Sequence, residues 1–262
     1  MLSVFKREPL SSTECVDRIQ DIVYEYLKPM GFCKYGRTFH RFADGDISQV
    51  IHLQNGSPSK GIHDILWVNV GIRVPECAER SFTVSAPMKK YYREYECNIR
   101  NRLGFLADGK DTAYDLRKRP EKTAADMIAR IKKYVMPAFD ALSSRDAILL
   151  HRADFPSFDL MTRDIKTLDE AMIFGRRGDM EKASELFNAY YHAVLAEYHA
   201  DLENGTETYL RKGDTLVYRN AKTGETETVT AEKDSYVTAY HANRDHINDL
   251  EALAQKLGIV LK

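Results

Sequence analysis

The chain has 262 residues, of which 44% are hydrophobic, 10% aromatic and 29% charged, with a formal net charge of −1. This length and composition suit one large globular domain or two modest ones, and they exclude a wholly disordered chain, because enough apolar surface is present to offset the entropy of ordering. No apolar run approaches the roughly 18 residues of a membrane-spanning helix, so we expect no membrane association. The charge is uneven: residues 1–150 carry 24 Lys and Arg against 19 Asp and Glu, whereas residues 151–262 carry 14 against 20.

The cysteines and the N-terminus predict a reduced, cytoplasmic protein. Cys15, Cys33, Cys77 and Cys97 show no C-x-x-C spacing and no paired histidine, so we expect four ordinary thiols and no zinc site. The first residues place their apolar side chains before their positive ones, which is the reverse of a secretory signal.

The first half of the chain predicts a helix, several antiparallel strands and a second helix. Ser11 and Glu14 have the spacing of a capping box, and apolar residues then recur at helical spacing as far as Leu27. Pro29 should end this helix slightly early, and Gly31 should stop it in a left-handed conformation. Strands are predicted over residues 35–42, 47–54, 65–74, 96–106 and 113–116.

The second helix of this half begins near Thr123, and Pro137 should kink or split it. Residues 76–95 give no clear prediction, although Met88–Tyr95 is dense in Lys and Tyr. A helix, antiparallel strands and a further helix together describe an α+β sheet domain over residues 10–145.

The second half predicts a mostly helical subdomain over residues 160–262. Helices are expected over residues 167–174 and 179–202, joined by a tight turn, and a last helix runs from about Ile247 to Leu257. Gly258 after Leu257 has the pattern of a Schellman cap. One β-hairpin is expected near residues 215–230, with Gly224 supplying a positive φ. The predicted fold class is therefore α+β, an antiparallel sheet backed by helices and followed by a helical subdomain with one β-hairpin.

The motif search predicts no catalytic set, no metal and no cofactor. No nucleophile elbow, P-loop, dinucleotide fingerprint or zinc-protease motif occurs. His192 and His199 are seven residues apart, and His241 and His246 are five apart, so neither pair has the i, i+4 spacing that lets two imidazoles share a cation.

One face of the predicted sheet is the candidate site. If Leu66, Val68, Val70 and Ile72 face the helices, alternation turns Trp67, Asn69, Gly71 and Arg73 to the other side. The same period brings Thr38, His40, Phe42, His52, Gln54, Asn98, Arg100 and Arg102 to that side, which suits an anion or a protein surface because Arg and Trp dominate contact energies. The predicted ligand- or partner-binding residues are Arg37, His52, Gln54, Trp67, Asn69, Arg73 and Arg100. The alternative is a solvated face, or a face covered by the acidic second half.

Three segments, over residues 27–41, 50–54 and 68–72, resemble the bacterial family called domain of unknown function 4304. The shared pattern is a helix followed by G-F-x-x-x-G-R-x-F, I-x-x-Q and N-x-G-I strands, although Leu53 stands where an aromatic residue is expected. The resemblance covers roughly residues 10–145 and implies a cytoplasmic bacterial α+β domain with no assigned activity and no catalytic residue. It places Arg37, Gln54 and Asn69 at motif positions.

The leading hypothesis is a non-enzymatic module that binds a ligand or a protein partner. The alternative is an enzyme acting on a small anionic substrate, with Arg73, Arg100 and His52 near its centre. Basic residues mix with aromatic ones in Lys89–Arg93, but a net charge of −1 does not favour nucleic-acid binding. The oligomeric state stays open.

Overall fold

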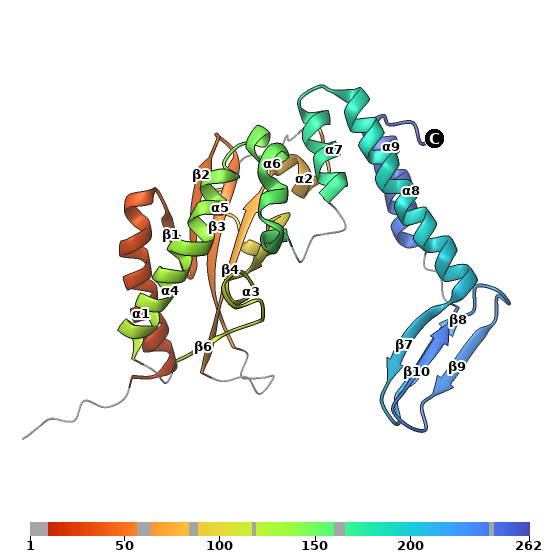
Figure 1. The fold of residues 1–262 in the computed structure, drawn as a ribbon, viewed down its shortest axis with the longest axis horizontal. Helices are drawn as coiled ribbons and strands as arrows, with labels where there is room; N and C mark the ends of the chain where they lie inside the picture. Colours follow the sequence, from red (N-terminus) through yellow and green to blue (C-terminus); the bar gives the residue numbers. More distant parts are fainter. Residues whose placement is uncertain (1–9, 57–63, 84–88, 117–118, 160–165, 241–243) are drawn as a thin grey trace, which may run out of the picture. The chain divides into compact units, whose positions relative to one another are not determined.

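The computed structural model describes residues 10–56, 64–83, 89–116, 119–159, 166–240 and 244–262 (Figure 1). The chain divides into two compact units, Met1–Asp169 and Glu170–Lys262. The fold is α+β, as predicted, and the two units are described separately below.

The first helix, α1 (Ser12–Leu27), has the predicted capping box. The Ser11 hydroxyl accepts from the Glu14 amide, and the Glu14 carboxylate accepts from the Ser11 amide at 2.8 Å. Pro29 lies in a single 3₁₀ turn, η1 (Lys28–Met30), which Gly31 ends with a φ of +84°. Local signals alone therefore define both ends of this helix.

The sheet of the first unit is antiparallel and has the order β1-β2-β3-β4-β5, with β6 also pairing with β4. Its strands are β1 (Cys33–Tyr35), β2 (Thr38–Ala43), β3 (Ile47–Asn55), β4 (Ile65–Arg73), β5 (Ile99–Arg102) and β6 (Tyr114–Asp115). The strand predicted over residues 35–42 is present from Thr38 as β2, while Tyr35 belongs to β1, because Gly36 has a φ of +55° and turns the chain between the two strands. The strand predicted over residues 96–106 also ends early, at Arg102, where the short helix α3 (Leu103–Asp108) begins.

The second long helix of this unit changes its hydrogen-bond pattern near Pro137, where a kink or split was predicted. The second long helix starts at Pro120, which occupies its first turn, and consists of α4 (Pro120–Arg130), a π-helical turn η4 (Ile131–Val135) and α5 (Met136–Ala141). Pro137 has no amide hydrogen to donate, so the hydrogen-bond register shifts just before it. The unit also contains α2 (Pro75–Glu79), α6 (Arg145–His151) and the 3₁₀ turns η3 (Glu94–Glu96), η5 (Arg152–Asp154) and η6 (Pro156–Asp159).

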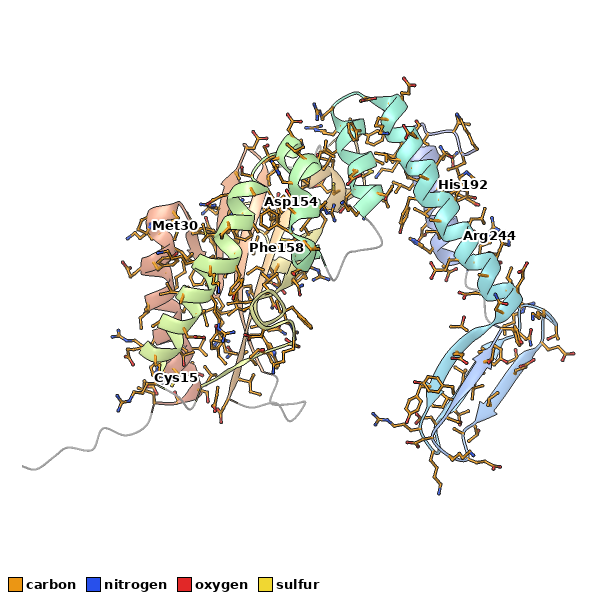
Figure 2. The ribbon with its side chains drawn as sticks, viewed as in Figure 1. Cys15, Met30, Asp154, Phe158, His192 and Arg244 are labelled. Atoms are coloured by element: carbon orange, nitrogen blue, oxygen red, sulfur yellow. The ribbon has the colours of Figure 1, made fainter. Side chains whose placement is uncertain are left out.

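One face of the sheet packs against these helices and forms the core. Phe39, Ile51 and Val70 lie opposite one another on adjacent strands and are fully buried. Helix α1 contributes Tyr24, which stacks on Phe39 with ring centroids 6.1 Å apart. Figure 1 shows α1 and α4 on the same side of the sheet, and Phe158 in Figure 2 extends the core, with its ring 5.9 Å from that of Phe139.

The second unit combines long helices with two pairs of strands. It contains most of α7 (Lys166–Arg176), together with α8 (Met180–Asn204) and α9 (Asp245–Leu257). The predicted hairpin is present as β8 (Thr215–Arg219) and β9 (Thr226–Thr230), and a second pair, β7 (Thr206–Leu210) with β10 (Ser235–Ala239), was not predicted. The Schellman cap is confirmed, because the Ile259 amide donates to the Ala254 carbonyl at 2.9 Å after Gly258. None of the helices in the described residues has the length and apolar character needed to cross a membrane.

Candidate functional site

The strand register places the predicted site residues on one side of the sheet, here called the second face. Residues directly opposite each other in antiparallel strands point the same way. His52 lies opposite both Thr38 and Asn69, Gln54 opposite Trp67, and Gly71 opposite Arg100. Arg73 belongs to the same face by alternation along β4, and Arg37 lies in the turn between β1 and β2. The predicted grouping therefore exists, while the binding role of these residues remains a hypothesis.

One end of the second face is covered by the chain itself. Tyr92 and Cys97, from the segment Lys89–Asn98, are buried against Val50 of β3. A Cβ atom added to Gly71 would lie only 2.7 Å from Cys97 Cβ, so the segment can approach β4 this closely because residue 71 is glycine. Arg73 lies at this covered end, 5% exposed, where its Nη2 donates to Glu79 at 2.6 Å and its guanidinium lies 4.1 Å from the Tyr92 ring centroid.

The other end of the second face is open and carries a cavity of about 650 Å³, here called the large cavity. Its strand side contains three of the predicted residues, Arg37, His52 and Gln54, together with Tyr35, Gly36 and Thr38. The opposite wall comes from the segment Lys89–Asn98 and consists of Tyr91, Arg93, Glu94 and Tyr95. The segment that covers one end of the face thus forms a wall of the open end.

A second, smaller cavity of about 90 Å³ adjoins the large one, because Gln54 and Glu94 line both. The predicted residues Asn69 and Arg100 line this small cavity, as does Arg102. Asn69 donates to the Gln54 carbonyl at 2.8 Å and accepts from Arg102 Nε at 3.3 Å. The Arg102 guanidinium also binds Asp111 and lies 5.2 Å from the ring of Trp67, so Trp67 supports this network without lining either cavity.

His52 is held in one orientation at the wall of the large cavity. Its Nδ1 lies 2.9 Å from the hydroxyl of Thr38. Burial lowers the pKa of His52, and Arg93 and Arg37 lower it further, while Glu94 opposes them. The ring is therefore predominantly neutral at pH 7. Thr38 is only 3% exposed, so its hydroxyl orients the ring and is not presented to a ligand as a nucleophile.

Sequence reasoning missed the wall that faces the strands. Tyr91, Arg93, Glu94 and Tyr95 fall in the stretch without a structural prediction, and the only signal was its density of basic and tyrosine residues. Tyr91 stacks on Tyr35 with centroids 4.6 Å apart. Arg93 Nη1 donates to the Tyr95 hydroxyl at 3.1 Å at the rim of the cavity, and hydrogen bonds to Tyr95 and Tyr91 raise the pKa of Arg93.

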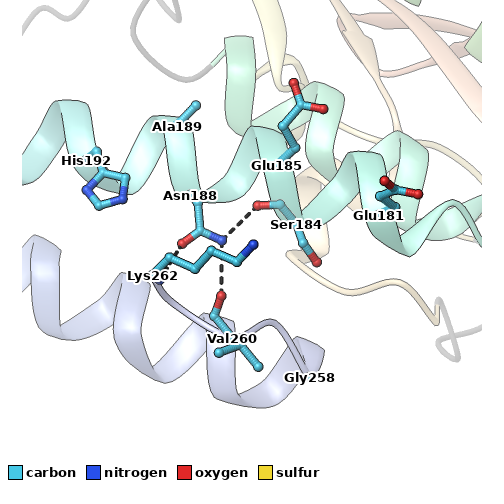
Figure 3. Close-up of a pocket in the computed structure, with 9 residues that line it drawn as sticks. All are labelled: Glu181, Ser184, Glu185, Asn188, Ala189, His192, Gly258, Val260 and Lys262. Carbon is cyan, nitrogen blue, oxygen red and sulfur yellow. Dashed lines mark hydrogen bonds between the residues drawn. The ribbon is translucent and has the colours of Figure 1, made fainter.

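The second unit has a separate cavity of about 700 Å³ beside α8 (Figure 3). Asn188 of α8 binds the C-terminal residues that line this cavity: its Nδ2 donates to the Val260 carbonyl at 3.1 Å and its Oδ1 accepts from the Lys262 amide at 2.9 Å. Glu185 and His192 also line this cavity. Among the described residues no three His, Cys, Asp or Glu side chains lie together as metal ligands do.

The first unit is thus an α+β domain in which one antiparallel sheet has helices on one face and a partly open, polar second face. The family model described as domain of unknown function (DUF4304) matches residues 23–141, which confirms the resemblance seen in the motifs. Every predicted site residue, and both cavities of the second face, lie within the matched segment. Neither a curated protein nor a solved structure matches this chain.

Proposed function

We propose that the sheet domain is a non-enzymatic binding module, which holds an anionic group of a ligand or of a protein partner at the open end of its second face. The observation that carries this proposal is a set of guanidinium groups without carboxylate partners. In the described part of the chain, Arg37, Arg93 and Arg100 make no ion pair, although all three line the two cavities. Guanidinium groups that are at least partly exposed and have no carboxylate partner are well suited to bind a carboxylate or phosphate.

The rigidity of the surroundings supports binding. Strands β3 and β4 pair along nearly their whole length, and the Gln54–Asn69–Arg102 network fixes the polar side chains between the cavities. A site whose side chains are already ordered loses little conformational entropy when a ligand arrives. We place this module in a bacterial cytoplasm, which agrees with four cysteines that are all free thiols.

Titration of the full chain with sodium phosphate, sodium sulfate and sodium acetate tests the proposal. Trp67, the single Trp of the chain, lies beside Arg102 and reports on binding by its fluorescence. Arg37→Gln and Arg100→Gln should each weaken anion binding at least tenfold, while Arg18→Gln, on the exposed surface of α1, should leave it unchanged. Binding of no anion, or equal loss in all three variants, would contradict the proposal.

Catalysis on a small anionic substrate is the second candidate, and His52 is the observation that favours it. A neutral imidazole at a cavity wall can act as a general base, and Arg100 could hold the substrate anion nearby. Arg73, which the sequence placed with them, is buried away from the cavities. Turnover of a phosphate or carboxylate ester that His52→Gln abolishes, with anion binding retained, would favour this candidate over the binding module.

A further inference from the structure

The charge of the two cavities indicates how much negative charge a ligand should carry. Arg37, Arg93 and Arg100 contribute three cations, and Glu94 contributes one carboxylate. The fourth guanidinium, that of Arg102, is already paired with Asp111. The two cavities together keep an excess of about two positive charges, with Arg37 and Arg93 at the large cavity and Arg100 at the small one. The face as a whole therefore favours a dianionic ligand such as a phosphate monoester, which carries roughly −1.5 to −2 at pH 7. A single carboxylate would leave part of this excess uncompensated.

Apart from the Glu94 carboxylate, the polar side chains of the small cavity favour a ligand group that accepts hydrogen bonds. The side-chain amide oxygens of Gln54 and Asn69 already accept hydrogen bonds, Gln54 Oε1 from Asn69 and Asn69 Oδ1 from Arg102. Arg100 and Arg102 can contribute only N–H donors. The small cavity, of about 90 Å³, has room for a group of the size of a phosphoryl group.

The large cavity is aromatic where the small cavity is polar, because three tyrosines line it. Tyr35 and Tyr91 form a stacked pair with their planes 10° apart. Tyr95 is 57% exposed, its hydroxyl accepts from Arg93, and the Arg93 guanidinium lies 5.8 Å from its ring centroid, so the exposed part of the ring is open to a ligand. Tyrosine faces of this kind bind planar rings, and nucleobases stack on them without strong preference for one base.

The two cavities can hold one molecule, since Gln54 and Glu94 border both of them. Glu94 makes no ion pair in the described residues, and because it lines both cavities it borders the middle of such a molecule. It would repel an anion there but would accept a hydrogen bond from a hydroxyl group. A ligand with a phosphate at one end, hydroxyls in the middle and a planar ring at the other end meets all three requirements.

From this geometry we propose that the second face binds a nucleoside monophosphate, with the phosphate in the small cavity beside Arg100, a sugar hydroxyl at Glu94 and the base on Tyr95 in the large cavity. This inference rests on the proposed function and specifies the ligand class of the same site.

Isothermal titration of the full chain with AMP, GMP, CMP and UMP, with the four nucleosides and with inorganic phosphate tests it. At least one monophosphate should bind tenfold or more tightly than both its own nucleoside and inorganic phosphate. Tyr95→Ala should weaken monophosphate binding about tenfold and leave phosphate binding unchanged, whereas Arg100→Gln should weaken both. Tyr209→Ala, at a half-exposed tyrosine of the second unit, is the matched control and should change neither.

The outcomes separate the two proposals. If inorganic phosphate binds, Arg100→Gln abolishes its binding, and the base adds no affinity, the nucleotide inference is overturned while the anion-binding module stands. If no anion binds, or if binding is insensitive to both Arg100→Gln and Tyr95→Ala, both proposals are overturned. A single-stranded oligonucleotide that binds more tightly than every mononucleotide, when its affinity is divided among the bases it contacts, would also overturn the assignment to a free nucleotide. Circular dichroism of each variant checks that a loss of binding does not come from unfolding.

Discussion

Replacing Gly71 with alanine should destabilise the sheet domain and displace the wall of both cavities. The added methyl group would lie 2.7 Å from Cys97 Cβ and 2.8 Å from its Sγ, with the Ile99 carbonyl oxygen at 3.3 Å. Carbon atoms in contact prefer about 3.5–4.0 Å, so the segment Lys89–Asn98 must move by the better part of an ångström. Overpacking of this kind typically costs about 1–3 kcal/mol.

For a unit of this size that cost corresponds to a fall in melting temperature of about 3–10 °C. The fluorescence of Trp67 follows the unfolding of this unit alone, because it is the only Trp in the chain. The movement should also weaken ligand binding, since the same segment carries Tyr95, Arg93 and Glu94. Cys97→Gly removes both clashing atoms, so the double variant should recover part of the lost stability and part of the affinity, whereas Cys97→Ala keeps Cβ and should recover little.

Ser48→Ala is the matched control on the neighbouring strand. It removes one buried oxygen that has no hydrogen-bond partner among the described residues, so stability should stay the same or rise. A melting temperature of Gly71→Ala within about 1 °C of the wild type would refute the argument that glycine is needed for this contact.

Three further predictions concern other parts of the chain. His40 is 2% exposed, and burial lowers its pKa to about 4, so the folded state resists protonation of this side chain. The contribution of the neutral ring to the free energy of unfolding should be fully present above the unfolded pKa near 6.5 and should fall by about 3 kcal/mol as the pH is lowered to 4. Denaturant titration of His40→Gln should show a weaker pH dependence over this window. Asp169 is fully buried and accepts from Arg80 at 2.9 Å and from Arg152 at 3.1 Å, so Asp169→Asn should lower the free energy of unfolding by about 3–5 kcal/mol in chemical denaturation. The control is Asp140→Asn, whose side chain is 69% exposed in its pair with Arg41 and which should cost less than about 1 kcal/mol. Similar small costs for both variants would contradict the importance of burial. Asn188→Ala removes the bonds to Val260 and Lys262, so amide exchange over residues 258–262 should accelerate while α8 stays protected, and unchanged exchange would show that these bonds do not hold the segment.

Local sequence signals predicted the ends of the elements well. The capping box of Ser11 and Glu14, the left-handed Gly31 and the Schellman cap at Gly258 all involve residues within a few positions of one another, and the structure contains each of them. Gly36 was one of two exceptions, because a glycine inside an otherwise strand-like run is compatible with both a continuous strand and a turn. The strand predicted over residues 96–106 failed for a related reason: short apolar runs do not distinguish a strand from a helix.

Alternation along the strands predicted the composition of the second face, since a period of two fixes which residues share a side once the buried side is known. The register of β2, β3, β4 and β5 agrees with this grouping. What the alternation could not give is which residues of that face remain accessible. Arg73 and Arg100 look equivalent in sequence, yet Arg73 is buried with Glu79 and Tyr92 while Arg100 lines a cavity.

The sequence by itself determined the α+β class, the caps and turns of most helices and strands, and the two sides of the sheet, because each depends on neighbouring residues or on a short repeat. Only the tertiary structure decided where the candidate site lies. The segment Lys89–Asn98 has no helical or strand periodicity, and its path depends on the contact of Cys97 with Gly71, which is 26 positions earlier in the sequence. The pairing of β7 with β10 depends in the same way on residues far apart in the chain. Such contacts arise from packing between distant segments, and no local pattern in the sequence encodes them.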